Sequence, residues 1–232
     1  MALVTGAGSG VGRATARALS QEGFRLVLAG RTANTLAATA DVVAERGGAA
    51  VIAPVDVGSE PDVRRVVALA GKAFGGIDVL IHAAAIGLYG PVDTYALADW
   101  DRTIATNLTS AFLLSRAVLP SMRARGGGAI IAIASGAGKQ GYPTLAAYAA
   151  SKFGLIGFMQ SLAGEVSGDG IKVCTVVPGS IMTGFAGRTA EEKHAERGDK
   201  RYLEPEDVAE AILFLLRQPD RAWTQELNLW PF

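Results

Sequence analysis

Short apolar stretches alternate with longer stretches of helical periodicity along the chain. The apolar stretches predict strands over residues 2–4, 25–29, 50–54, 77–82, 129–134, 171–177 and 226–229. Apolar residues at spacings of three and four predict helices from Val11 onward and over residues 35–46, 61–74, 100–125, 146–163 and 205–216. Strands that are apolar almost throughout are typical of a parallel sheet with both faces buried. We therefore expect an α/β fold with a doubly wound parallel sheet and helices on both faces.

Nothing in the sequence marks a linker, an internal repeat or a low-complexity tract, so we expect one domain over residues 1–232. Residues 180–203 are polar, contain glycines and lack a strong period, and we interpret them as a mobile lid with some helix. Ligands of doubly wound sheets bind beyond the carboxyl ends of the strands. Residues that follow the predicted strands are therefore the first candidates for a site.

A glycine loop separates the first predicted strand from the first predicted helix. It reads Thr5, Gly6, Ala7, Gly8, Ser9, Gly10, Val11, Gly12. Glycines let the backbone approach a dinucleotide pyrophosphate, and the N-terminus of the following helix supplies N–H donors and a positive dipole end. The spacing is T-G-x-x-x-G-x-G; the pattern G-x-G-x-x-G would need glycine where Val11 stands. The loop favours a dinucleotide site, with a plain turn as the alternative.

The second predicted strand is followed by an arginine, at the position where an NAD-binding site has an acidic residue. Arg31 follows Gly30, and a carboxylate about 20 residues beyond the glycine loop would bind the adenosine ribose 2′-hydroxyl. A guanidinium instead suits a 2′-phosphate, to which the Ser9 hydroxyl adds a donor. We predict NADP(H) over NAD; the alternative is an ordinary exposed arginine.

Other candidates also follow strands. Asp56 and Val57 come after the third predicted strand, where the carboxylate suits an adenine amino group, or equally a helix cap or a turn. Ala84, Ser135 and Pro178 follow the fourth, fifth and sixth. Because the carboxyl ends of parallel strands share one edge of the sheet, these candidates converge there.

Tyr148 and Lys152 stand four residues apart in the predicted helix 146–163. This spacing brings both side chains to one helix face. A nearby ammonium favours the phenolate and lowers the pKa of a tyrosine from about 10, so Tyr148 is a candidate general acid or base. A surface pair is the commoner explanation of the spacing by itself. Asn107 lies mid-helix, where asparagine is unfavourable, so it is either a functional residue or a plain polar position.

The composition narrows the function further. Half of the 232 residues are hydrophobic, and 22 basic residues balance 22 acidic ones, so nothing indicates nucleic-acid binding. The single cysteine, Cys174, lies in an apolar stretch, where we expect a buried, inert thiol and no disulfide. We see no signal-peptide pattern and no apolar run of roughly 18 residues, and we expect a cytoplasmic protein without a membrane span or a metal.

Together these features resemble the classical short-chain dehydrogenase/reductase family over essentially the whole chain. The resemblance rests on the Thr5-to-Gly12 loop, Asn107, Ser135 thirteen residues before Tyr148, the Y-x-x-x-K of Tyr148 and Lys152, and Pro178-Gly179 leading to Thr183. It implies a Rossmann-type fold of about seven strands in three layers. It also implies a homo-oligomer, since members are commonly tetramers (a homotetramer) or dimers.

The resemblance implies catalytic roles. Tyr148 gives a proton to a carbonyl oxygen in reduction, or takes it from an alcohol in oxidation. Lys152 lowers the pKa of Tyr148 and holds the nicotinamide ribose hydroxyls. Ser135 hydrogen-bonds the substrate oxygen and stabilises charge that develops there. Asn107 holds a water that links Lys152 to solvent.

The resemblance likewise implies a cofactor site, in which Thr183 and the backbone of Ile181 contact the nicotinamide amide. The expected cofactor-binding residues are Gly6, Ser9, Gly10, Val11, Gly12, Arg31, Asp56, Val57, Ala83, Ala84, Ala85, Tyr148, Lys152, Pro178, Gly179, Ile181 and Thr183.

The sequence departs from the family in three places. His82, Ala83, Ala84 and Ala85 replace the usual N-N-A-G; we expect a repacked but working turn in which His82 has a structural role. Ser9 stands where a basic residue often precedes the second motif glycine, so NADP preference rests mainly on Arg31. The familiar glycine-rich C-terminal ending is absent.

We therefore expect an NADP(H)-dependent oxidoreductase that interconverts a carbonyl and a secondary alcohol. The alternative is a non-catalytic NADP-binding regulatory protein on the same fold, since fold does not fix function. We expect the substrate to contact residues 137–144, Leu88, Tyr89 and the lid from Met182 to Tyr202. The lid residues Arg188, His194 and Arg197 either meet an anionic group or are solvated.

Overall fold

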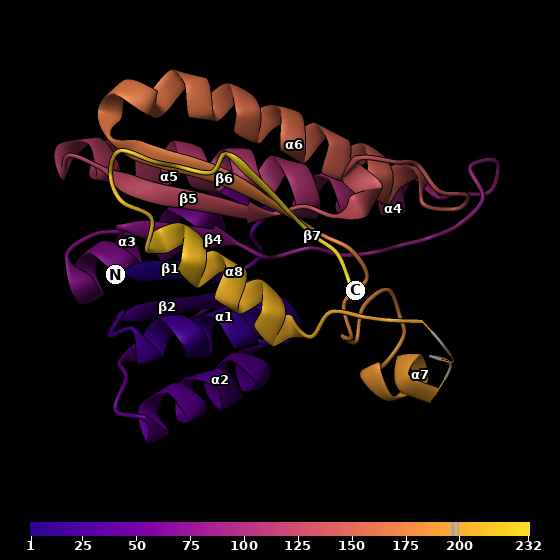
Figure 1. Cartoon of the computed structure of the whole chain (residues 1–232), viewed down its shortest axis with the longest axis horizontal. Helices are drawn as coiled ribbons and strands as arrows, with labels where there is room; N and C mark the ends of the chain where they lie inside the picture. Colours follow the sequence, from indigo (N-terminus) through magenta and orange to yellow (C-terminus); the bar gives the residue numbers. More distant parts are fainter. Residues whose placement is uncertain (196–197, 199) are drawn as a thin grey trace.

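One sheet of seven parallel strands runs through the computed structural model (Figure 1), which describes residues 1–195, 198 and 200–232. The strands are β1 (Ala2–Thr5), β2 (Leu26–Gly30), β3 (Ala50–Pro54), β4 (Val79–His82), β5 (Gly128–Ile133), β6 (Ile171–Pro178) and β7 (Glu226–Leu229). Their order across the sheet is β3-β2-β1-β4-β5-β6-β7. The order reverses between β1 and β4, and ligands bind at such a switch point.

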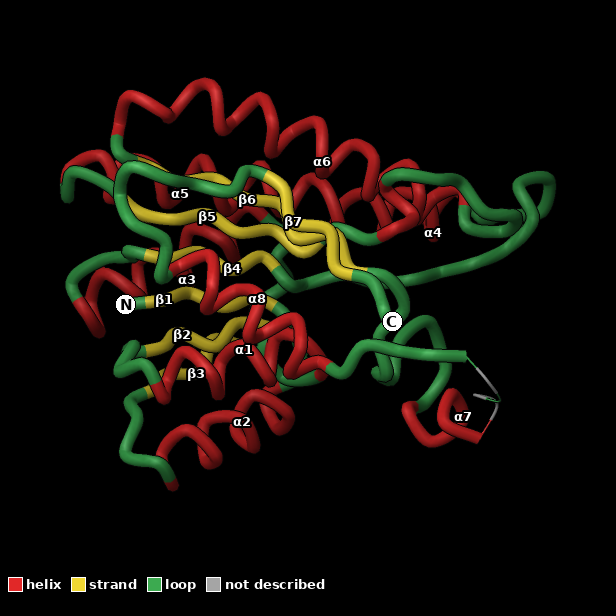
Figure 2. The backbone as a smooth tube through the Cα atoms, viewed as in Figure 1, coloured by secondary structure: helices red, strands yellow, loops and turns green. Residues whose placement is uncertain are grey.

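Helices cover both faces of the sheet (Figure 2). They are α1 (Gly10–Gln21), α2 (Ala33–Glu45), α3 (Glu60–Phe74), α4 (Leu97–Ile104), α5 (Ser110–Ala124), α6 (Ala146–Val166), α7 (Ala190–Ala195) and α8 (Pro205–Leu216). Short 3₁₀ turns follow β5 (Gly136–Gly138) and α6 (Ser167–Asp169), and a π-helical segment (Ala105–Thr109) joins α4 to α5.

Side chains of β1 alternate between two cores, because successive strand residues point to opposite faces. Leu3 packs with Leu114 of α5 and Leu155 of α6 on one face. Val4 packs on the other face with Leu19 of α1. The expected three-layer, doubly wound Rossmann-type fold is thus confirmed.

The helix predicted over residues 100–125 differs most from the structure. It begins at Leu97, and the π-helical segment divides it. Apolar spacing predicted a helix face with Trp100, Ile104, Leu108, Ala111 and Leu114. Ala111 and Leu114 are buried, but Trp100 is 38% exposed, and the polar Thr103, Asn107 and Ser110 are fully buried. The buried polar side chains are tolerated because each is hydrogen-bonded.

The 180–203 segment is tied together at its base. Ile181 pairs with Leu203 in an isolated bridge, and the Met182 N–H donates to the Leu203 carbonyl at 2.8 Å. The segment contains α7, so the expected helix is confirmed. Its mobility stays a prediction, and Arg197 lies outside the described residues.

Cys174 of β6 is fully buried, as expected. Burial, with a smaller contribution from the charge of Glu226, raises the pKa of the thiol to about 12. The thiol is therefore protonated at neutral pH, and its nucleophilicity is low. Within the described part of the chain, none of the helices has the length and apolarity needed to cross a bilayer.

Candidate active site

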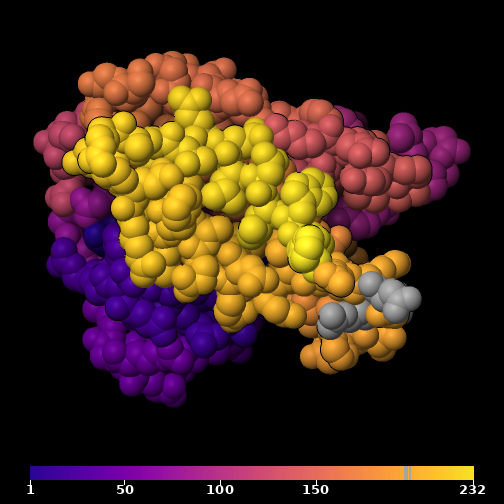
Figure 3. Space-filling model, viewed as in Figure 1, coloured from indigo at the N-terminus to yellow at the C-terminus, as the bar shows by residue number. Residues whose placement is uncertain are grey.

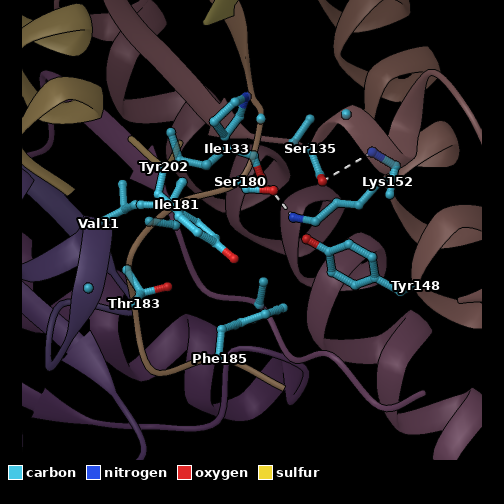
Figure 4. A pocket seen from close by; sticks show the side chains of 18 of the residues that line it. Val11, Ile133, Ser135, Tyr148, Lys152, Ser180, Ile181, Thr183, Phe185 and Tyr202 are labelled. Atoms are coloured by element: carbon cyan, nitrogen blue, oxygen red, sulfur yellow. Dashed lines mark hydrogen bonds between the residues drawn. The ribbon is translucent and has the colours of Figure 1, made fainter. Parts of the chain in front are cut away.

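A cavity of about 460 Å³ opens at the carboxyl edge of the sheet, on the switch point between β1 and β4. The glycine loop forms one wall, and the ends of β5 and β6 with the first turns of α6 form another. The 180–203 segment contributes Thr183, Phe185 and Tyr202 (Figure 4).

The glycine loop has room for backbone only. Gly6 has φ +66°, and a Cβ there would lie 2.9 Å from the backbone of Ala83. Gly10 has φ +47°, and a Cβ there would lie 3.2 Å from the Thr183 side chain. Positive φ and close contact both demand glycine. The loop is thereby held against the turn after β4 and against the 180–203 segment.

The N-terminus of α1 presents backbone donors to this cavity. Ser9 is the N-cap but makes no side-chain capping hydrogen bond, and the first turn holds no acidic residue. Gly10, Val11 and Gly12 line the cavity. Since the first N–H groups of a helix lack intrahelical partners and carry the positive dipole end, this wall suits an anion such as a pyrophosphate.

Tyr148 and Lys152 face the cavity together from α6, as their spacing predicted (Figure 4). The Lys152 Nζ lies 5.7 Å from the centroid of the Tyr148 ring and donates to the Ile133 carbonyl at 2.8 Å. The Ser135 Oγ accepts from the Ala137 N–H at 3.1 Å and hydrogen-bonds Tyr148. The three side chains thus form one cluster at the end of β5.

Burial controls the protonation of this cluster. It raises the pKa of Tyr148 above the ordinary value, against the opposite effect of the Ser135 hydrogen bond. It lowers the pKa of Lys152 to about 7. The expected lowering of the Tyr148 pKa is therefore wrong for this structure, because burial of the phenol raises that pKa. Lys152 instead becomes a group that gains or loses a proton near neutral pH.

Asn107 lies in the π-helical segment and ties two other elements together. Its Nδ2 donates to the Ile86 carbonyl at 2.9 Å and to the Ser151 Oγ at 3.0 Å. Its Oδ1 accepts from the Ile86 N–H at 2.8 Å. Asn107 thereby fixes the turn after β4 against α6, beside Lys152. Single π turns occur frequently at functional sites.

His82 forms the centre of a buried chain of hydrogen bonds. The Ser110 Oγ donates to the Thr106 carbonyl at 2.5 Å and lies 3.2 Å from His82 Nε2, which must then carry the proton between them. His82 Nδ1 is left to accept from the Thr5 Oγ1 at 3.2 Å. Thr5 in turn accepts from the Ala84 N–H at 3.2 Å. The chain joins β1, the turn after β4 and the π-helical segment.

This arrangement needs a neutral histidine. Burial, with a smaller contribution from the charge of Lys152, lowers the pKa of His82 to about 3. The expected structural role of His82 is thus confirmed: its ring makes the hydrogen bonds that hold Ala84 and Ser110 in position.

Most predicted site residues line the cavity. These are Gly6, Ser9, Gly10, Val11, Gly12, Ala83, Ala85, Ser135, Tyr148, Lys152, Pro178, Gly179, Ile181 and Thr183. Ala84 and Asn107 lie behind its wall, where they take part in the hydrogen bonds described above.

The residues predicted for the adenosine end lie outside the cavity. Arg31 is exposed at the end of β2 and makes no ion pair within the described ranges. Gly8 of the loop lies against Thr35 of α2, since a Cβ at Gly8 would be 3.0 Å from the Thr35 Cβ. The Asp56 carboxylate accepts from the Gly58 N–H at 2.9 Å, as the turn interpretation predicted. Val57 is buried.

Sequence reasoning missed two residues. Trp230, after β7, lines the cavity; its position at the end of a strand was the available signal. Arg13 of α1 donates a hydrogen bond to the Gly8 carbonyl and so brings a second cation to the glycine loop.

Comparisons with known proteins agree with this geometry. The family model for short chain dehydrogenases matches residues 1–194. An uncharacterized oxidoreductase of Staphylococcus aureus (strain MRSA252) is 33% identical over 231 residues, which are 100% of this chain and 96% of that protein. A glycine betaine reductase of Emericella nidulans is 32% identical over 235 residues; they span all of this chain but 18% of that much longer protein.

Solved structures share the fold. A metagenomic short-chain oxidoreductase in complex with NADP is 35% identical, with a TM-score of 0.87 over 100% of this chain and 96% of that one. Actinorhodin polyketide ketoreductase with NADPH is 34% identical, with a TM-score of 0.91 over 99% of this chain and 95% of that one.

The buried His82 should make stability fall in acid. Its pKa is about 3 in the folded chain and about 6.5 unfolded, so between these values the unfolded chain binds the extra proton. The free energy of unfolding should then decrease as the pH falls through this window, by up to about 1.4 kcal/mol per pH unit. Urea unfolding of the wild type and of His82→Asn from pH 7 to 4.5 checks this, because the variant lacks that part of the slope.

The matched control is His194→Asn, because the chain has only two histidines and His194 is exposed. This variant should keep the wild-type slope. An equal loss of slope in both variants would contradict the buried hydrogen-bond chain.

Asn107→Ala should destabilise the fold. The change removes three hydrogen bonds and leaves the Ile86 N–H and carbonyl without their partner. We expect a loss of about 2–4 kcal/mol in the free energy of unfolding, measured by urea denaturation. Asn34→Ala, at an exposed position of α2, is the control and should change stability little. A loss below about 0.5 kcal/mol in Asn107→Ala would show that these bonds contribute nothing net.

Proposed function

The chain belongs to the short-chain dehydrogenase/reductase family, and on that premise we propose that it is an NADP(H)-dependent oxidoreductase that interconverts a carbonyl and a secondary alcohol. The observation that carries the proposal is the meeting of the Ser135–Tyr148–Lys152 cluster and the glycine loop in one cavity. Hydroxyl groups that move protons and a wall of backbone donors then face the same bound molecule.

The residues present fit a dinucleotide. Gly6 and Gly10 leave a cradle that a side chain would fill, and the N-terminus of α1 supplies donors for the pyrophosphate. Arg31 at the end of β2 and Arg13 at the glycine loop would meet a 2′-phosphate. Both relatives of known structure described above were solved with NADP or NADPH. These facts support NADP(H) over NAD.

When bound, NADPH supplies the hydride, and the protein supplies position and protons. In reduction, the Tyr148 hydroxyl gives its proton to the carbonyl oxygen. Ser135 donates its own hydroxyl proton to the same oxygen, while its Oγ accepts from the Ala137 N–H. Two donors at the oxygen stabilise the negative charge that develops there. In oxidation, Tyr148 takes the proton from the alcohol.

Lys152 has two proposed tasks. Its pKa of about 7 lets it restore the proton that Tyr148 loses at neutral pH. Its remaining N–H groups, beyond the one given to Ile133, hold the nicotinamide ribose hydroxyls. We propose that protons reach Lys152 through water held at the π-helical segment. The Asn107 side chain already uses both donors and its oxygen accepts from Ile86, so in this proposal a backbone carbonyl of the segment holds the water.

The second candidate, a non-catalytic NADP-binding protein, has less support. Binding alone does not need a buried amine beside a buried phenol, which costs desolvation energy. Assembly into tetramers or dimers is a proposal that rests on the resemblance, and movement of the 180–203 segment is a proposal that rests on its polar, glycine-containing sequence.

Tyr148→Phe should abolish turnover while leaving NADPH affinity nearly intact, because the change removes one oxygen and keeps the ring that packs in the site. The measurement is NADPH oxidation, followed by absorbance, across ketones, aldehydes, keto acids, quinones and sugars, with NADPH binding measured separately. We expect at least a hundredfold loss in kcat. Tyr95→Phe, outside the cavity, is the matched control. Turnover equal to that of the wild type in Tyr148→Phe would refute the proposed acid.

Arg31→Asp should shift the preference from NADPH toward NADH, because the carboxylate repels a 2′-phosphate and accepts from a 2′-hydroxyl. The readout is the ratio of the two dissociation constants. Arg46→Asp, an exposed arginine at the end of α2, controls for the change in net charge. If the ratio stays as in the wild type, Arg31 does not recognise the phosphate.

A further inference from the structure

Aromatic side chains are concentrated around the candidate site. Tyr89, Tyr142, Phe185, Tyr202 and Trp230 all line the cavity in addition to Tyr148. Four of the chain's five tyrosines are therefore in this one place, although only 7% of all residues are aromatic. Three of these rings keep large exposed surfaces: Tyr89 (44%), Tyr142 (43%) and Trp230 (54%). Exposed aromatic surface that converges on one cavity indicates a ligand.

Two of the rings fix the orientation of Tyr148. The rings of Tyr89 and Phe185 meet the Tyr148 ring edge-on, at centroid distances of 5.9 and 5.7 Å. They come from the turn after β4 and from the 180–203 segment. Their contacts with Tyr148 account for their position, whereas Trp230 makes no such contact within the described residues.

The benzo edge of the Trp230 indole packs closely against the backbone at two glycines beside the cluster. A Cβ on Gly136, the residue after Ser135, would be 2.7 Å from its Cη2. A Cβ on Gly179, the residue after Pro178, would be 2.8 Å from its Cε3. Both glycines have ordinary φ, so the space they leave serves the indole and not an unusual turn. The ring therefore borders the position where the substrate oxygen meets Ser135.

The strand before Trp230 is fixed firmly. The Gly179 N–H donates to the Leu229 carbonyl at 2.8 Å, and Lys139 forms an ion pair with Glu226 at 2.6 Å. The last residues of the chain lie beside the 180–203 segment (Figure 3). The Arg201 guanidinium lies over the Phe232 ring, 5.8 Å from the ring centroid. Trp230 thus lines the cavity in a preorganised position, which does not depend on bound substrate.

Aromatic walls bind either flat apolar groups or quaternary ammonium cations. The basic residues of this cavity favour a flat apolar group over a cation. Arg188 and Lys193 of the 180–203 segment line the same cavity. Burial, with a smaller contribution from the charge of Arg188, lowers the pKa of Lys193. A cationic substrate would lie beside these two basic side chains.

Resting on the proposed function, we infer that the substrate carries a planar aryl or conjugated group next to its carbonyl, and that the face of Trp230 binds that group. Trp230 is then the residue that selects flat substrates, and Ser135 and Tyr148 act on the carbonyl beside it.

The test compares two ketones of similar size, acetophenone and cyclohexyl methyl ketone, with NADPH as the reductant. Wild-type enzyme should show a higher kcat/KM for acetophenone. Trp230→Leu should reduce the ratio of the two kcat/KM values by roughly three- to tenfold, mainly through KM, because stacking on the indole is lost. Trp230→Phe should keep most of the ratio. Trp100→Leu, a half-exposed tryptophan outside the cavity, should leave it unchanged.

A ratio that Trp230→Leu leaves unchanged would overturn the inference, while Tyr148-dependent turnover of both ketones would keep the proposed function. Faster turnover of a ketone bearing a trimethylammonium group would also overturn it, in favour of a cation cage. If neither ketone reacts, calorimetry with benzamide and cyclohexanecarboxamide on the NADPH-loaded enzyme decides. Tighter benzamide binding that Trp230→Leu removes supports the inference; equal binding or none refutes it.

Discussion

A buried amine lies at the centre of the candidate site, and the rest of the cavity is built around it. Lys152 is 2% exposed and has a single hydrogen-bond acceptor, the carbonyl of Ile133, within the described residues. Taking an ammonium out of water is costly, so the group lowers its proton affinity. The hydrogen bond from Lys152 to Ile133 requires α6 to pack closely on the end of β5. That packing also brings Tyr148 to Ser135. The same burial that gives Lys152 a pKa of about 7 makes the phenol hold its proton more tightly.

The sheet could be predicted because its strands are apolar on both faces, and β3 and β7 have the predicted bounds. The pairing of Tyr148 with Lys152 was also accessible, since helical spacing determines which residues are neighbours. The pKa of Tyr148 could not be predicted, because helical spacing shows which side chains are neighbours but not how deeply they are buried. Burial depends on Tyr89 and Phe185, which come from segments far along the chain.

The burial of polar side chains in the core was the other feature that the sequence pattern could not predict. Apolar periodicity in residues 100–125 predicted a face that included Trp100, but the structure buries Thr103, Asn107 and Ser110. Each of these depends on a hydrogen bond, and the partners of Asn107 and Ser110 include residues distant in sequence, such as Ile86 and His82. A pattern of apolar residues contains no information about such partners. The position of Trp230 beside Ser135 likewise follows from the pairing of β7 with β6, which only the folded sheet defines.

The π-helical segment has a consequence for how this chain tolerates change. A π turn holds one residue more than an α turn, so Ala105–Thr109 acts as a one-residue insertion within an otherwise continuous helix. Each helical residue advances the side-chain direction by about 100°. The extra residue therefore lets Asn107 face the turn after β4 while Leu114 and Val118 face the sheet. A single deletion inside this segment would therefore restore an uninterrupted α-helix and leave α5 in phase with its core, and what it would remove is the position from which Asn107 reaches Ile86.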